Sequence, residues 1–217
     1  GISSYDFVNN RFIDSYFFGV NNSQIQVNQT ALVGTSLYAA TEEGLYKAST
    51  DDPNLVLESA WIKIAAGQWK AIGLVNNTLL GIVQSGGTSI CNALINDVAI
   101  ERHRESGSLL WVDVNEDALI LSFSNKILSF DADQLVSTLA TATANLSGQK
   151  FSSATQLGGN LFIGTSGSGL LLHNPSETRV VSPSGPLRND IFDLSVVADN
   201  EMWIAHGAFS QSYNPYP

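Results

Sequence analysis

The chain has 217 residues, of which 44% are hydrophobic and 14% are charged, a balance that favours a β-rich protein over a helical one. Its formal charge of −10 excludes nucleic acid as the expected partner, because no basic stripe is available to neutralise phosphates. No apolar run approaches the roughly 18 to 20 residues of a membrane-spanning helix, so no transmembrane segment is predicted.

The chain opens on glycine rather than methionine, which we interpret as the start of an expressed segment or of a processed fragment. The lack of a visible signal peptide therefore says nothing about the parent protein. The single cysteine, Cys91, has apolar neighbours and is expected to be a buried, inert thiol.

The first thirty residues match the rest of the chain poorly. Asparagine pairs at residues 9–10 and 21–22 predict turns, and the aromatic residues 16–18 predict a strand. We interpret residues 1–30 as the last strands of a structural unit that precedes a series of repeats.

From residue 36 onward one phrase recurs, in which a polar or small residue is followed by a mostly apolar run that ends in a small or polar residue. The phrase is anchored on Leu37, Leu79, Ala118, Leu161 and Met202. A strand-rich repeat of about 40 to 45 residues is typical of a β-propeller blade. We expect the phrase to form the innermost strand of each blade, because its small residues suit the close approach of neighbouring blades.

The fourth repeat shows the plan of a blade most clearly. Residues 154–157 and 161–165 predict two strands joined by a tight turn at Gly158 and Gly159, and residues 170–173 predict a third strand.

The outermost strand of each blade is harder to place, and the candidates are Val180 with Val181 in the fourth repeat and residues 61–64 in the first.

One segment breaks the pattern. Residues 133–140 carry apolar residues at helical spacing and predict a short helix inserted between blades.

Together the repeats predict an all-β fold, a β-propeller of about five blades, each a four-stranded antiparallel sheet. Residues 1–217 are expected to form a single propeller domain or fragment, with blades centred near residues 37, 79, 118, 161 and 202. We expect a partial arc of a larger propeller of about six to eight blades. A five-bladed ring closed by the first and last segments is the alternative, and an open arc could dimerise across its edges.

The sequence contains no catalytic motif, and we predict no enzyme activity, no cofactor and no metal site. The three histidines, His103, His173 and His206, fall in different repeats and share no ligand spacing. A binding protein is therefore the better hypothesis.

Four residues are candidates for binding. Trp61 and Trp69 flank Gly67 in a connection between blades, Tyr213 lies in a tail rich in Pro and Asn, and His206 follows an expected inner strand. An aromatic face suits a sugar ring, while the alternative is that these aromatic residues fill gaps between blades.

The phrase resembles the bacterial two-component-regulator propeller repeat. Leu161, Phe162, Ile163, Gly164 and Thr165, followed by Gly169 and Leu170, carry this resemblance, and residues 37–41 followed by 44–46 repeat it. Residues 37–61 and 185–207 are also similar to the propeller component of the type IX secretion machinery of Bacteroidetes. The second and third repeats depart from the pattern, because they lack the Gly-Thr pair.

The second resemblance implies a non-enzymatic scaffold and recognition module at the cell surface or in the periplasm, associated with the outer membrane. It implies protein partners in an outer-membrane attachment complex and binding of glycan or lipopolysaccharide, with the catalytic residues in a partner. The alternative is a ligand-sensing propeller of a hybrid two-component regulator, which the generic repeat supports. A propeller lyase or glycosidase would need carboxylates or histidines that converge at the channel mouth, and the strand starts show few.

Overall fold

The computed structural model describes residues 1–132, 134–142, 146–181, 191–197 and 201–206, the last two ranges by their backbone alone. The chain forms two compact units, Gly1–Val180 and Val181–Pro217. The described segments are strands joined by turns, with two short 3₁₀ helices, η1 (Val20–Asn22) and η2 (Glu58–Ala60). The fold is all-β, as the sequence predicts.

The first unit contains four antiparallel sheets of four strands, and within each sheet the strands lie in chain order. The first sheet comprises β3 (Val27–Val33), β4 (Ser36–Thr41), β5 (Gly44–Ser49) and β6 (Ile62–Ala66). The second comprises β7 (Gln68–Val75), β8 (Thr78–Ser85), β9 (Thr88–Ile95) and β10 (Val98–Ser106). The third comprises β11 (Leu109–Val114), β12 (Leu119–Phe123), β13 (Lys126–Asp131) and β14 (Gln134–Ala140). The fourth comprises β15 (Phe151–Leu157), β16 (Asn160–Thr165), β17 (Leu170–His173) and β18 (Thr178–Val181).

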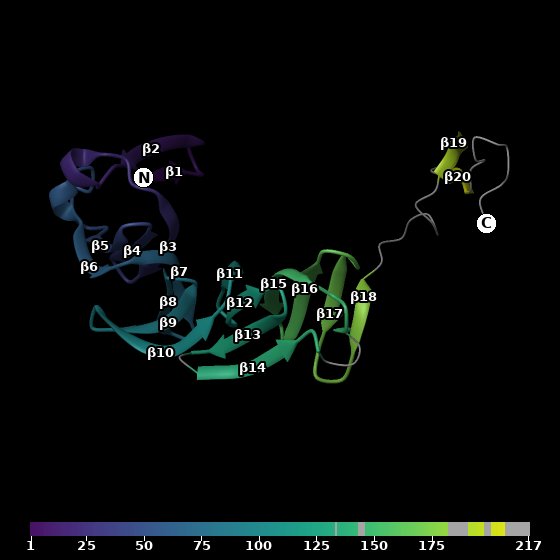
Figure 1. The fold of residues 1–217 in the computed structure, drawn as a ribbon. Helices are drawn as coiled ribbons and strands as arrows, with labels where there is room; N and C mark the ends of the chain where they lie inside the picture. Colours follow the sequence, from purple (N-terminus) through teal and green to yellow (C-terminus); the bar gives the residue numbers. More distant parts are fainter. Residues whose placement is uncertain (133, 143–145, 182–190, 198–200, 207–217) are drawn as a thin grey trace. The chain divides into compact units, whose positions relative to one another are not determined.

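These four sheets follow one another along the chain as the blades of a propeller arc (Figure 1). Two antiparallel hairpins accompany them. The hairpin of β1 (Ile2–Asp6) and β2 (Arg11–Tyr16) precedes the first blade, and its turn includes the predicted pair at residues 9–10. Of the aromatic segment predicted as a strand, only Tyr16 lies in β2. In the second unit, β19 (Ile191–Val197) pairs with β20 (Glu201–His206).

The first strand of each four-stranded sheet is the inner strand of its blade, because β3 contacts β7, β7 contacts β11, and β11 contacts β15. The recurring phrase forms the second strand of each sheet, namely β4, β8, β12, β16 and β20, with Ala118 just ahead of β12. The prediction that the phrase is innermost is therefore wrong. In the four-stranded sheets the second strand has a neighbour on both edges, and β12, which packs against a blade on each face, is buried along its whole length.

A β-bulge recurs at the start of every first strand. In each case one residue is skipped in the pairing with the second strand, and the skipped residues are Asn28, Lys70, Leu110, Ser152 and Phe192. The residue before each bulge is apolar, and at two of these positions, Trp69 and Phe151, it is fully buried. A bulge turns the side chains on either side of it in new directions. Each of the four blades of the first unit therefore has an irregular inner edge at the same place.

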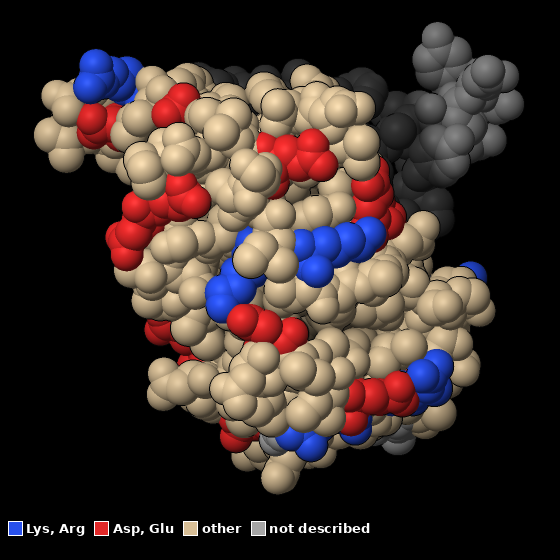
Figure 2. Space-filling model, turned by 90° about the vertical axis from the view of Figure 1, so that its left-hand side faces the viewer, with Lys and Arg blue, Asp and Glu red and all other residues tan. Residues whose placement is uncertain are grey.

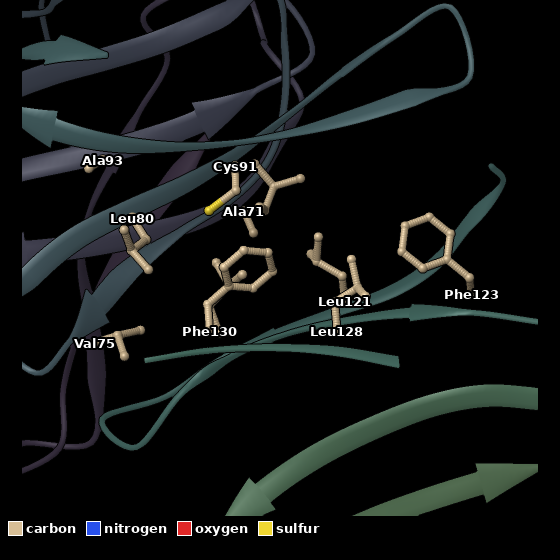
Figure 3. Packing of buried hydrophobic residues seen from close by; sticks show 11 residues of the cluster. Ala71, Val75, Leu80, Cys91, Ala93, Leu121, Phe123, Leu128 and Phe130 are labelled. Atoms are coloured by element: carbon tan, nitrogen blue, oxygen red, sulfur yellow. The ribbon is translucent and has the colours of Figure 1, made fainter. Parts of the chain in front are cut away.

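Apolar side chains fill the space between neighbouring blades. Between the second and third blades, Phe130 and Leu121 pack against Leu80 and Cys91 (Figure 3). Cys91 is buried, as the sequence predicts. Burying one such large side chain fully stabilises a fold by about 1.5–3 kcal/mol, so these layers hold each blade to the next.

The two inner strands β7 and β11 come unusually close at one point. A Cβ atom added to Gly73 would lie 2.5 Å from Cγ1 of Val114, well inside van der Waals contact. Glycine at this position in β7 therefore allows the two strands to approach, in the way that glycine in a strand interior often marks a close backbone approach.

The outer-strand candidates are confirmed, because Val180 and Val181 lie in β18 and residues 62–64 lie in β6. The helix predicted over residues 133–140 is wrong, because Gln134–Ala140 forms strand β14. Its apolar residues are spaced to suit a helix, yet Leu139 is the buried one of the set while Leu135 and Val136 are exposed. The free edge of β13 supplies hydrogen bonds that outweigh this local preference.

Candidate binding site on the inner strands

The two tryptophans predicted to bind a ligand are both largely buried, and Trp61 also lines an open pocket of about 610 Å³. Trp61 is 6% exposed, stacks on Phe18 at a centroid distance of 4.0 Å, and donates its indole N–H to the Leu55 carbonyl at 3.0 Å. Trp69 is 1% exposed and donates its indole N–H to the Ala66 carbonyl at 3.1 Å. Its ring covers Gly81, where an added Cβ would lie 2.5 Å from the indole. Trp69 has no open face for a ligand.

The other two predicted residues are placed only in part. His206 ends β20 and pairs with Ile191 along the backbone, and its side chain lies outside the described residues. Tyr213 also lies outside them. The structure thus does not bring the four predicted residues together in one described site.

The described histidines have local partners. His103 Nε2 lies 3.4 Å from a carboxylate oxygen of Glu105, and His173 Nδ1 lies 2.6 Å from the Thr178 hydroxyl. Burial lowers the pKa of His173. In the part of the chain that the structure describes, no three His, Cys, Asp or Glu side chains gather as metal ligands would.

Trp111 differs from the two buried tryptophans. It lies in inner strand β11 directly after the bulge, it is 52% exposed, and its neighbour Leu110 is 49% exposed. Among the described residues, no acceptor receives its indole N–H. The sequence analysis did not select Trp111, which lies in the apolar run of residues 109–112. The signal that distinguishes Trp111 is its position directly after the bulge. The residues at the same position in the other repeats are small or polar, namely Gln29, Ala71, Ser153 and Asp193.

Trp111 lines an open pocket of about 630 Å³ that is bounded by the inner strands β3, β7 and β11 and by Gln84 of β8. Its polar lining residues include Asn28, Gln29, Lys70, Gln84 and Asp113. Because three blades contribute to it, the pocket exists only when the blades are assembled.

The charged groups at this pocket are held by hydrogen bonds. Lys70 Nζ lies 2.7 and 3.0 Å from the two carboxylate oxygens of Glu42, and Asn28 donates to the same carboxylate at 2.9 Å. The hydrogen bond from Lys70, followed by that from Asn28, lowers the pKa of Glu42, so the carboxylate stays ionised. On the opposite side, Asp113 Oδ2 accepts hydrogen bonds from Thr155 at 2.7 Å and from Asn115 at 2.9 Å.

The ion pair with Lys70 does not give Glu42 the pKa of a general acid. A catalytic acid near neutral pH needs a raised pKa, whereas the pKa of Glu42 is lowered by its partners. The pocket offers an exposed indole beside amide side chains. Such a combination binds a polyhydroxylated ring through one apolar face and several hydrogen bonds.

The surface around the first blade mixes charges of both signs. Most basic groups on the face shown in Figure 2 lie beside acidic groups. Ion pairs between blades contribute to this pattern, as in Lys47 with Asp97 at 2.7 Å. Within the described residues, no helix is long and apolar enough to cross a membrane.

Comparison with known proteins gives structural likeness only. No family model and no curated protein matches the chain. The structure is similar to that of PorZ, an essential bacterial surface component of the type IX secretion system of Porphyromonas gingivalis. The TM-score is 0.64 at 16% identity, over 97% of this chain and 28% of PorZ.

Two further solved structures share the architecture. One is the extracellular domain of the hybrid two-component system BT4673 from B. thetaiotaomicron, with a TM-score of 0.56 at 14% identity, over 94% of this chain and 28% of that one. The other is YCF48 bound to D1 peptide, with a TM-score of 0.51 at 16% identity, over 86% of this chain and 62% of that one. At these identities the likeness shows the fold, a β-propeller, and the chain spans little more than a quarter of PorZ and of the BT4673 extracellular domain.

Proposed function

We propose that this chain is a non-enzymatic scaffold and recognition module of a surface or periplasmic protein that acts in type IX secretion and cell-surface attachment. It binds glycan or lipopolysaccharide in the pocket lined by Trp111. Protein partners in an outer-membrane complex belong to the same proposal. The fold that this chain shares with PorZ, together with the two stretches at residues 37–61 and 185–207, supports this role.

The exposure of Trp111 carries the binding proposal. Among the three tryptophans whose side chains are described, two are buried with their N–H groups bonded, and Trp111 alone is half exposed with its N–H open. A large aromatic side chain that is exposed on an inner strand does not contribute the stabilisation that its burial would give to the fold. Aromatic residues in this situation are typical of binding sites.

We place residues 1–217 as one arc of a larger propeller, with residues 1–30 as the end of a preceding blade. The hairpin of β1 and β2 supports this, because it is a two-stranded sheet that precedes the first complete blade, to which it is joined through the short helix η1. Dimerisation across open blade edges belongs to the same proposal, and light scattering tests it through the mass in solution.

The binding role is tested by screening the protein on a glycan microarray and measuring the best ligands by calorimetry. Trp111→Ala should weaken binding at least about tenfold, equivalent to about 1.4 kcal/mol. Phe12→Ala is the matched control, because Phe12 is an exposed aromatic residue of β2 away from the pocket. Binding that survives Trp111→Ala, or no glycan binding at all, would contradict the proposal.

The second candidate is a ligand-sensing propeller of a hybrid two-component regulator. The close match of residues 161–165 and 169–170 to the regulator repeat favours it. The coding sequence after residue 217 separates the two candidates. A sorting domain of β-sandwich type supports the secretion role, and a transmembrane helix followed by a kinase supports the sensor.

A further inference from the structure

The one cation among the described residues that line the Trp111 pocket is already neutralised. Both carboxylate oxygens of Glu42 lie within 3.0 Å of Lys70 Nζ. The side chains of this pair are 28% and 27% exposed, so the ion pair is partly shielded from water. An anionic ligand would have to compete with Glu42 for Lys70, and the like charge of Glu42 would oppose its approach.

A second carboxylate, which belongs to the pocket lining itself, adds to this effect. Asp113 lines the pocket and is held by hydroxyl and amide donors rather than by a cation. The chain as a whole carries a formal charge of −10. Local and overall charge therefore both disfavour the entry of a negatively charged sugar.

Uncharged hydrogen-bonding groups in the pocket are open. Gln29 Oε1 accepts a hydrogen bond from the Ile72 backbone N–H at 3.3 Å, which leaves its amino group without an acceptor among the described residues. Within the same part of the chain, the Gln84 side chain makes no hydrogen bond, and nor does the indole N–H of Trp111. These groups can donate to hydroxyl oxygens, and the Gln84 carbonyl oxygen can accept from a hydroxyl.

From these contacts we infer that the pocket selects an uncharged saccharide, which stacks on Trp111 and hydrogen-bonds through its hydroxyls to Gln84 and Gln29. This inference rests on the proposed glycan-binding function and narrows it to one chemical class of ligand. Discrimination between ligands comes from the charge pattern of the pocket. Hydroxyl groups of a ligand match the open amides, whereas its carboxylate, sulfate or phosphate groups are opposed by the charges of Glu42 and Asp113.

The test is a glycan microarray that carries neutral oligosaccharides together with their uronic acid, sulfated and phosphorylated counterparts, probed with the whole chain. We expect neutral glycans to bind at least tenfold more tightly than matched anionic ones. Raising NaCl from 50 to 500 mM should change the affinity less than twofold, because no net charge is neutralised on binding. A preference for anionic glycans that falls with salt overturns this inference and leaves the proposed function intact, whereas the absence of any glycan binding overturns both.

Two variants test the mechanism of selection. Gln84→Ala should weaken binding of the neutral glycan at least fivefold, while Gln24→Ala, at an exposed glutamine outside the pocket, should not change it. Glu42→Gln removes the charge that neutralises Lys70 and should raise the affinity for the anionic counterpart at least fivefold at 50 mM NaCl. Circular dichroism spectra and melting curves of each variant report folding separately. Failure of Glu42→Gln to improve anion binding in a folded protein would overturn the charge argument.

Discussion

Lys47 Nζ lies 2.7 Å from Asp97 Oδ2, and this pair ties the third strand of the first blade to the turn between the outer strands of the second. The Tyr38 hydroxyl donates to the other oxygen of Asp97 at 2.8 Å. The turn of one blade is thus held by two side chains of its neighbour. The joint between the first two blades therefore depends on polar contacts as well as on apolar packing.

The Lys47–Asp97 contact should make stability depend on pH. The hydrogen bond from Lys47 lowers the pKa of Asp97 in the folded protein, with a smaller contribution from Tyr38. The stabilisation is therefore present above the ordinary pKa of an aspartate, about 3.9, and is lost as pH falls through the lower folded-state pKa. The side chains are 27% and 37% exposed, so water screening limits the pair to about 0.5–1 kcal/mol.

Melting temperatures of the wild type and Asp97→Asn at pH 7 and near pH 3 test this. We expect the variant to melt at a lower temperature at pH 7 and the difference to shrink in acid. Asp51→Asn serves as the control, because Asp51 is an exposed turn residue. An equal difference at both pH values would show that the carboxylate charge is not the cause.

Gly73→Ala should destabilise the fold by about 1–3 kcal/mol, because the new methyl group would overlap Val114 of the neighbouring inner strand. Chemical denaturation measures the loss. The double variant with Val114→Ala should recover part of it, since the obstructing side chain is then removed. If the two losses simply add, the two strands do not approach as the structure describes.

The buried and exposed tryptophans should respond differently to truncation. Trp69→Ala removes a fully buried side chain and should cost about 3–5 kcal/mol in the free energy of unfolding. Trp111→Ala should change stability by less than about 1 kcal/mol, while it weakens ligand binding. A large stability loss with Trp111→Ala would mean that Trp111 is a packing residue, and the binding site would have to lie elsewhere.

Much of the fold could be predicted from the sequence because each blade repeats the same turn chemistry. Glycine and asparagine at the hairpin turns, such as Gly158 with Gly159 and Asn76 with Asn77, adopt the positive φ values that tight hairpins require. The apolar phrases between these turns then identify the strands. Propeller architecture follows from their period, and the structure confirms the four-stranded sheets.

The errors have physical causes. Residues 134–140 have apolar spacing that suits a helix, but they form a strand because they hydrogen-bond to the free edge of β13. The recurring phrase is apolar because it forms the second strand of each sheet. Apolarity alone therefore did not identify the innermost strand of the blade. Trp69 and Trp111 look alike in sequence. Their separation into a packing and an exposed residue depends on which side of a β-bulge each one lies, and the bulge becomes visible only when pairing is known.

The most direct test of the central claim is a two-dimensional ¹H–¹⁵N NMR titration that follows the indole N–H groups of the four tryptophans. Trp111→Phe identifies the Trp111 resonance, and the titrant is the tightest-binding neutral glycan from the array. We predict a saturable shift of the Trp111 resonance, with the resonances of Trp61 and Trp69 unchanged because their N–H groups are buried and bonded. A glycan that binds without moving the Trp111 resonance would contradict the account.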